Sequence, residues 1–280
     1  MTETQAPPAR RIGPRLLVLL VVFAIVLVVS ALLNSAAAAN PVTALVVGGL
    51  TATGGILLYR MIVRRLEQRP VTELDPATLR PEVLRGTAAG IALFAVTIGL
   101  IAVAGGYRVT GWGSVPAAVA TLGTMTGAAV AEELLFRGVL FRLIQDWAGT
   151  AAALTVSGAL FGALHLFNPG ATVWGAVAIA AEAGLMLGAA YTATRSLWLP
   201  IGLHLGWNFA ESGLFGTTVS GTTGTHGLLR SVTEGPAVLS GGSFGPEGSI
   251  FAILVGGVTA ALLLRHAASR GRIVRARRAR

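Results

Sequence analysis

Long apolar runs dominate this sequence and limit what it can fold into. A transmembrane helix needs about 20 consecutive apolar residues. Only 12% of the 280 residues are charged and 54% are hydrophobic, whereas a soluble domain carries about a quarter charged residues. The sequence therefore predicts an all-α, polytopic membrane helix bundle. Its expected transmembrane helices number about eight: Leu16–Leu33, Val42–Tyr59, Gly86–Ala104, a run from Val115 into the segment 127–141, Gly149–Phe167, Val173–Tyr191, a shorter Leu197–Phe209, and Ser249–Leu264.

The positions of the arginines predict how this bundle is oriented. The chain has a net charge of +9 and contains no lysine, so all of its basic residues are arginine. If eight helices cross the membrane, every arginine-rich segment falls on one side, which the positive-inside rule identifies as cytoplasmic. Both termini are then cytoplasmic. The main arginine-rich segments are Arg10 to Arg15, Arg60 to Arg85 and Arg265 to Arg280.

The same charge pattern bears on partners and location. Basic chains bind either nucleic acid or anionic membrane surfaces. Here the arginines flank apolar runs, so we expect membrane lipids as partners and no nucleic acid. We expect an integral membrane protein, most simply in the plasma membrane. The sequence leaves the oligomeric state open.

The first apolar run has a second interpretation. Arginines followed by an apolar run and the small residues "NSAAAAN" (34–40) resemble a secretory signal peptide with its cleavage site. The run of 18 residues is longer than the apolar region of a usual signal peptide, which favours a retained helix. Cleavage would leave the orientation of the rest unchanged.

The chain divides into four predicted regions. Residues 1–85 hold two transmembrane helices and a basic cytoplasmic loop, and residues 86–212 hold the core helices. Residues 213–248 are rich in Gly, Thr and Ser and predict a long external loop. Residues 249–280 hold the last helix and a basic tail. Cysteine is absent, which excludes disulfides, thiol catalysis and Cys-ligated metal.

Few polar groups lie inside the apolar runs. An ionisable side chain in lipid is costly unless it faces protein or water and finds a partner. Glu133 and Arg137 are four residues apart on one helix and can form an ion pair, whereas Glu132 points about 100° away, as the helical period requires. The simplest alternative is a solvated ion pair at the cytoplasmic end of a helix.

Two further runs carry polar side chains within residue pairs of the same helical spacing. Phe161 and His165 share one helix face, and His204 and Asn208 share another. Each pair alone is more typical of interhelical hydrogen bonding. Together the three runs supply a carboxylate, two imidazoles and a carboxamide, which can activate water and stabilise an oxyanion. Glu182 also lies inside a run, and Glu211 follows Asn208; their roles are open.

Three motifs in this order resemble the CAAX prenyl endopeptidase type II family, also called the CPBP family of intramembrane proteases. They read "EELLFR" (132–137), "FGALH" (161–165) and "HLGWN" (204–208), and the resemblance covers roughly residues 86–212. It implies an endopeptidase that cuts membrane-associated peptides or lipidated proteins, as in CAAX processing and bacteriocin processing. In the implied roles Glu132 activates water with His165, and His204 with Asn208 forms the oxyanion site. Glu133, Arg137 and Phe161 would support them.

Metal dependence and activity are open at this point. Glu132, His165 and His204 form a possible zinc set, because two histidines and a carboxylate occur in hydrolytic zinc sites. No HExxH motif is present, and a glutamate-activated water needs no metal, so we favour no cofactor. The alternatives to a protease are a non-proteolytic immunity or regulatory protein of the same family, and a proton-coupled transporter. The transporter predicts internal repeats, and none is visible.

A catalytic role for Glu132 also requires a particular helix length. If the helix ended at Arg137, Glu132 would lie about 8 Å from the inner boundary, whereas His165 would lie about 24 Å from Gly149. The two depths agree if the helix continues through Phe141 towards Trp147, and a tilt of the helices would also bring them closer. The catalytic interpretation therefore predicts a buried and paired Arg137.

Overall fold

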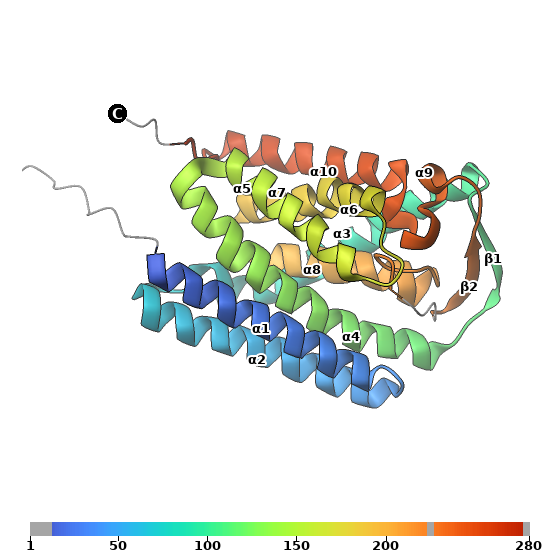
Figure 1. Ribbon diagram of the computed structural model, residues 1–280, viewed down its shortest axis with the longest axis horizontal. Helices are drawn as coiled ribbons and strands as arrows, with labels where there is room; N and C mark the ends of the chain where they lie inside the picture. The colour runs from blue at the N-terminus through green and yellow to red at the C-terminus, as the bar shows by residue number, and fades with distance from the viewer. Residues whose placement is uncertain (1–12, 223–226, 277–280) are drawn as a thin grey trace, which may run out of the picture.

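The structure is a computed structural model that describes residues 13–222 and 227–276. Within these ranges the chain forms a bundle of long helices, which confirms the predicted all-α membrane fold (Figure 1). Some residues named above lie outside the described ones: Arg10, Arg11, His226, Arg277, Arg278 and Arg280.

Eight helical segments correspond to the eight predicted crossings. One of them contains a π-helical stretch near its middle, and two others end in one. In chain order the elements are α1 (Gly13–Ala37), α2 (Pro41–Glu67), α3 (Pro76–Val103), α4 (Val115–Glu133) with π-helical η2 (Leu134–Phe141), α5 (Arg142–Leu164), α6 (Val173–Ile179) with π-helical η4 (Ala180–Gly184) and α7 (Leu185–Thr194), α8 (Trp198–Asn208) with π-helical η5 (Phe209–Leu214), and α10 (Ile250–Ser269).

Six stretches of the described chain are long and apolar enough to cross a membrane. One of them, Val115–Phe167, is 53 residues long and turns back on itself at Gly149, so it makes two passes. The pair α8–η5 is shorter than the others and lies inside the bundle, where all but a few of its residues are buried.

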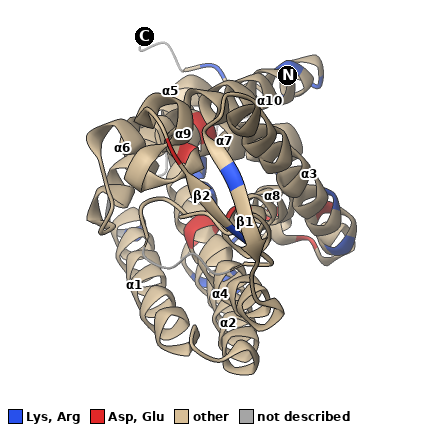
Figure 2. Ribbon diagram, turned by 90° about the vertical axis from the view of Figure 1, so that its right-hand side faces the viewer, with Lys and Arg blue, Asp and Glu red and all other residues tan. Residues whose placement is uncertain are grey.

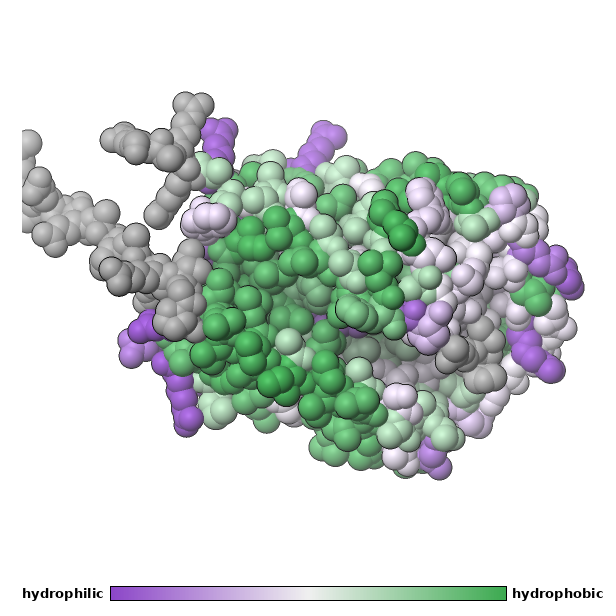
Figure 3. All heavy atoms as spheres, viewed as in Figure 1, coloured by the Kyte–Doolittle hydropathy of each residue, from purple (hydrophilic) through white to green (hydrophobic). Residues whose placement is uncertain are grey.

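The surface of the bundle has the polarity that a bilayer requires. Large apolar side chains such as Leu17, Leu50 and Val258 point outwards. Hydrophobic residues cover much of the visible face, and hydrophilic ones gather towards its two ends (Figure 3). Viewed from the β1–β2 end, most of the ribbon is neither acidic nor basic (Figure 2). The start of α1 and the end of α10 lie at the same end, as an even number of crossings requires.

Helices α2 and α3 extend beyond their predicted apolar runs. Asp75 caps α3 by accepting a hydrogen bond from the Ala77 amide, and the short connection is held by Glu73, which is 3% exposed. Arg69 donates to both Glu73 carboxyl oxygens, and the Tyr59 hydroxyl donates to one of them. Burial raises the pKa of the Glu73 carboxyl, but these hydrogen bonds outweigh it and hold the pKa below its ordinary value.

Helix α8 is pressed against α3 by paired glycines. A Cβ on Gly90 would lie 2.3 Å from the Leu203 carbonyl oxygen, and a Cβ on Gly206 would lie 2.2 Å from the Thr87 carbonyl oxygen. Small residues spaced four apart allow such close backbone approach in membrane bundles. The contact fixes the position of α8, which carries the third motif.

The predicted external loop contains order that the sequence did not indicate. Strand β1 (Tyr107–Trp112) pairs antiparallel with β2 (Leu229–Thr233), with an irregularity between Val109 and Gly111. The ribbon joins the α3–α4 connection to the segment after η5, at the end opposite the start of α1 (Figure 1). A short α9 (Ala237–Ser240) and η7 (Pro246–Gly248) follow it before α10.

Candidate functional site

The first two motifs lie on the two arms of one helical hairpin. The helical chain continues through α4, η2 and the start of α5, and turns at Gly149, where φ is 85° and ψ is 173°. Glu132 precedes this turn by 17 residues and His165 follows it by 16. At about 1.5 Å per residue both lie about 25 Å along their arms, so the two arms bring them to the same depth. The requirement that the helix continue past Phe141 is confirmed.

Arg137 is fully buried and paired, as the catalytic interpretation requires. Its Nη1 donates to Glu133 Oε1 at 2.8 Å, and its Nη2 donates to the carbonyl oxygens of Ala183 at 3.1 Å and Gly184 at 3.2 Å. The guanidinium carbon also lies 4.6 Å from the centroid of the Phe161 ring, which gives a cation–π contact. The alternative of a solvated ion pair at a helix end is therefore wrong.

Two π-helical stretches make this arrangement possible. Arg137 lies in η2, and its carbonyl acceptors lie in or next to η4, on the opposite helix. A π-turn interrupts the regular i to i+4 bonding, and such turns occur often at functional sites. Here the Arg137 guanidinium connects the two π-helical stretches η2 and η4 across the interior of the bundle.

His204 lies between the two glutamates of the first motif. Its Nδ1 is 3.0 Å from Glu133 Oε1, and its Nε2 is 3.9 Å from Glu132 Oε2. Because a carboxylate only accepts, Nδ1 carries the proton of the shorter bond. Glu133 was expected to support only its own motif; in the structure it also orients the imidazole of the third motif.

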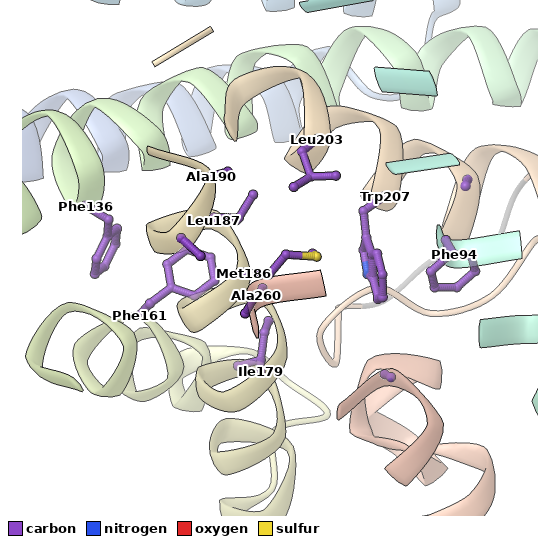
Figure 4. Packing of buried hydrophobic residues seen from close by; sticks show 14 of the residues in the cluster. Phe94, Phe136, Phe161, Ile179, Met186, Leu187, Ala190, Leu203, Trp207 and Ala260 are labelled. Atoms are coloured by element: carbon purple, nitrogen blue, oxygen red, sulfur yellow. The ribbon is translucent and has the colours of Figure 1, made fainter. Parts of the chain in front are cut away.

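His165 is oriented by its own helix. Its Nδ1 lies 2.7 Å from the Phe161 carbonyl oxygen, which is an acceptor, so Nδ1 is the donor and Nε2 is left for another group. The ring of Phe161 lies 4.8 Å from the His165 ring and 6.0 Å from the His204 ring, measured between centroids. Phe136 packs edge-on against Phe161 at 5.0 Å, within the core cluster of Figure 4. Phe161 is thus the point at which the three motifs meet.

Exposure separates the members of this site. Glu133 and Arg137 are fully buried, while the Glu132 side chain is 16% exposed and His165 is 8% exposed. Asn208 lies one turn beyond His204 and is partly buried. Its amide makes no hydrogen bond to any described residue. The structure therefore joins Glu132, Glu133, Arg137 and His204 directly, and it relates His165 to them through Phe161.

Three more glutamates are buried in the described part of the bundle. Glu182 and Glu211 are fully buried, and none of their carboxyl oxygens has a hydrogen-bond donor among the described residues. Glu247 is 1% exposed and accepts bonds from Trp207 and Ser220. Burial of Glu247 could not be predicted from the sequence, because this residue lies in a Gly- and Ser-rich segment typical of exposed loops.

The proposed zinc set does not converge. Within residues 13–222 and 227–276, no three His, Asp or Glu side chains are grouped so that they could hold one metal ion. Glu132 Oε2 and His204 Nε2 lie 3.9 Å apart, and the described residues bring no third donor of this kind to them.

Comparison with known proteins gives one match. Residues 113–210 match the family described as "Type II CAAX prenyl endopeptidase Rce1-like". This range contains the three motifs and ends before the segment 213–248. No curated protein and no solved structure matches the chain.

Proposed function

We propose that this integral membrane protein, whose residues 113–210 match the Rce1-like family of type II CAAX prenyl endopeptidases, hydrolyses peptide bonds with a water activated by Glu132. At family level the match indicates a CAAX-type intramembrane protease. The substrates that suit a site enclosed by apolar helices are membrane-associated peptides or lipidated proteins. We place the protein in the plasma membrane, with the arginine-rich ends of the bundle in the cytoplasm.

The carboxylate of Glu132 supports this proposal best. Its Oε2 accepts no hydrogen bond from the described residues and lies 3.9 Å from His204 Nε2. A carboxylate with a free oxygen in a largely dry site is a suitable general base. Its neighbour Glu133 also has one oxygen without a described partner, but its other oxygen is held by Arg137 and His204 and its side chain is fully buried. We therefore assign the base to Glu132, whose side chain is 16% exposed.

The histidines then take different roles. His165 is held through Nδ1, which leaves Nε2 to hold the attacking water or to pass its proton to the leaving amine. His204 can donate to a developing oxyanion through Nε2 only when both ring nitrogens carry protons. The carboxylates of Glu132 and Glu133 on either side stabilise that charge. Asn208, one turn further along α8, would supply the second donor.

We test this function by reconstituting the purified protein in lipid with a library of membrane-associated peptides. We expect cleavage by the wild type and a loss of about 100-fold in kcat/KM for His165→Ala, because acid–base groups typically contribute about 10²–10⁴-fold. His266→Ala, at an exposed histidine on α10, is the matched control and should retain full activity. Full activity of His165→Ala would remove this histidine from the mechanism. Absence of cleavage, with native function kept by the Glu132→Gln variant in cells, would favour a regulatory protein instead.

We also propose that the reaction is independent of metal, since the site donors do not converge. Elemental analysis of active protein should find far less than one zinc per chain, and dialysis against a strong chelator should leave the cleavage rate unchanged. Stoichiometric zinc that is lost together with activity, and restored with it, would contradict this proposal.

A further inference from the structure

The segment between η5 and α10 contacts both histidine-bearing helices at equivalent positions. Asn168 follows His165 by three residues, and Trp207 follows His204 by three. The Asn168 amide donates to the Ser220 carbonyl oxygen at 2.7 Å. The Trp207 indole donates to Glu247 Oε1 at 3.1 Å. One segment of chain thus binds the same turn beyond each histidine.

Ser220 and Glu247 complete a connection between these two contacts. The Ser220 hydroxyl donates to Glu247 Oε2 at 2.5 Å, so an unbroken series of hydrogen bonds runs from Asn168 to Trp207. Ser220 and Glu247 are 4% and 1% exposed. Charged residues are almost never this buried unless they are paired, and Glu247 has no described arginine among its hydrogen-bond partners. We call Ser220 and Glu247 the bridge.

The backbone around the bridge is held at several points. The Gly221 amide donates to the Phe244 carbonyl oxygen at 2.6 Å, and the Gly170 amide donates to the Gly221 carbonyl oxygen at 2.7 Å. Gly245 has φ of 104°, and a Cβ there would lie 2.1 Å from the Thr218 carbonyl oxygen. These contacts fix the bridge relative to both helices before any substrate binds.

A glutamine at position 247 would keep most of these contacts. Its amide oxygen can accept the Trp207 indole N–H, and its amide nitrogen can donate to the Ser220 hydroxyl oxygen, which now pairs with Glu247 Oε2. We therefore expect glutamine to hold the bridge and alanine to break it.

We propose that Glu247 and Ser220 are positioning residues that set the spacing between His165 and His204. The inference rests on the proposed peptidase function. Because catalysis depends on sub-ångström placement of groups, loosening the bridge should lower the rate of the chemical step. Substrate binding should change little, since both side chains are buried and already engaged within the protein.

The test compares Glu247→Ala, Glu247→Gln and Ser220→Ala in lipid-reconstituted protein, with Glu234→Ala as control. Glu234 lies on the same segment, but its side chain is 65% exposed and, among the described residues, pairs with Arg108 alone. We expect Glu247→Ala to lower kcat by about 10- to 100-fold with KM within about twofold. Glu247→Gln should stay within about threefold of the wild type. Ser220→Ala removes only a hydroxyl group and should lower kcat about fivefold. This variant tests the proposal if Glu247→Ala does not fold.

Hydrogen exchange of the same variants gives a readout that does not require activity. Glu247→Ala should speed exchange in peptides covering 162–168 and 203–209, and Glu234→Ala should not. Unchanged exchange in both peptides, unchanged kcat for Glu247→Ala and Ser220→Ala, or an equal loss for Glu247→Gln and Glu247→Ala would each overturn the proposal. If the wild type cleaves nothing, the peptidase function fails, while the exchange data still decide whether the bridge links the two helices.

Discussion

Replacing Glu132 by glutamine is expected to reduce peptide cleavage by about 10³-fold, within the range of about 10²–10⁴-fold that general bases contribute. Glutamine keeps the size of the side chain and its contact with His204, but it cannot take a proton from water. Steady-state cleavage of a membrane-associated peptide measures the effect. The midpoint of thermal unfolding in the same detergent should be nearly unchanged. The Glu132 side chain is partly exposed, and its ion pair with His204 is long, at 3.9 Å.

The control for this substitution is Glu234→Gln, which changes an exposed glutamate that directly follows β2. It should leave the rate unchanged. If Glu132→Gln retains more than about a tenth of the wild-type kcat, Glu132 is not the base. The proposed mechanism would then have to be abandoned, even if the protein proves to be a peptidase.

Replacing Arg137 by leucine is expected to give the largest loss of stability, about 3–5 kcal/mol, which is typical when one partner of a buried ion pair is removed. Glu133 would be left buried without its 2.8 Å partner. The carbonyl oxygens of Ala183 and Gly184 would also lose a donor. Reversible unfolding in mixed detergent micelles, or the midpoint of thermal unfolding, would measure the change.

Two further variants show whether that loss of stability comes from the buried ion pair. Arg65→Leu, at an exposed arginine of α2, should change stability by less than about 0.5 kcal/mol, as surface substitutions usually do. The double variant Glu133→Leu with Arg137→Leu should recover part of the lost stability, because no unpaired charge remains. It should still be inactive, since His204 loses the carboxylate that orients it. A single Arg137→Leu variant as stable as the wild type would show that the pair is not buried in the membrane.

Much of the fold could be predicted from the sequence, because the thickness of the bilayer sets the length of the apolar runs that cross it. All eight predicted runs are helices, and Gly149 is where the hairpin turns. The β1–β2 ribbon could not be predicted, since its strands are more than 100 residues apart and neither shows clear alternation. The extensions of α2 and α3 were not predicted, because local backbone geometry and capping define those helix ends rather than hydropathy. Gln68 ends α2 in the left-handed conformation, and Asp75 caps the start of α3.

The site shows a similar division. Helical spacing within one segment predicted the Glu133–Arg137 pair, and the catalytic interpretation predicted its burial. Contacts between segments depend on how helices rotate against each other, and π-turns add rotation that spacing rules do not include. For that reason the bond from Glu133 to His204 and the central place of Phe161 emerged only from the structure. Glu182 and Glu211 are now located in the buried interior, but without a partner that would define a role.

The hairpin centred on Gly149 also limits how the length of this chain can vary. Both arms measure nearly the same number of residues from the turn to the reacting groups, and each residue adds about 1.5 Å of rise and 100° of rotation. An insertion or deletion in one arm alone would therefore separate Glu132 from His165 and turn one of them away. Relatives that keep the chemistry should differ in length outside residues 132–165, or change both arms together.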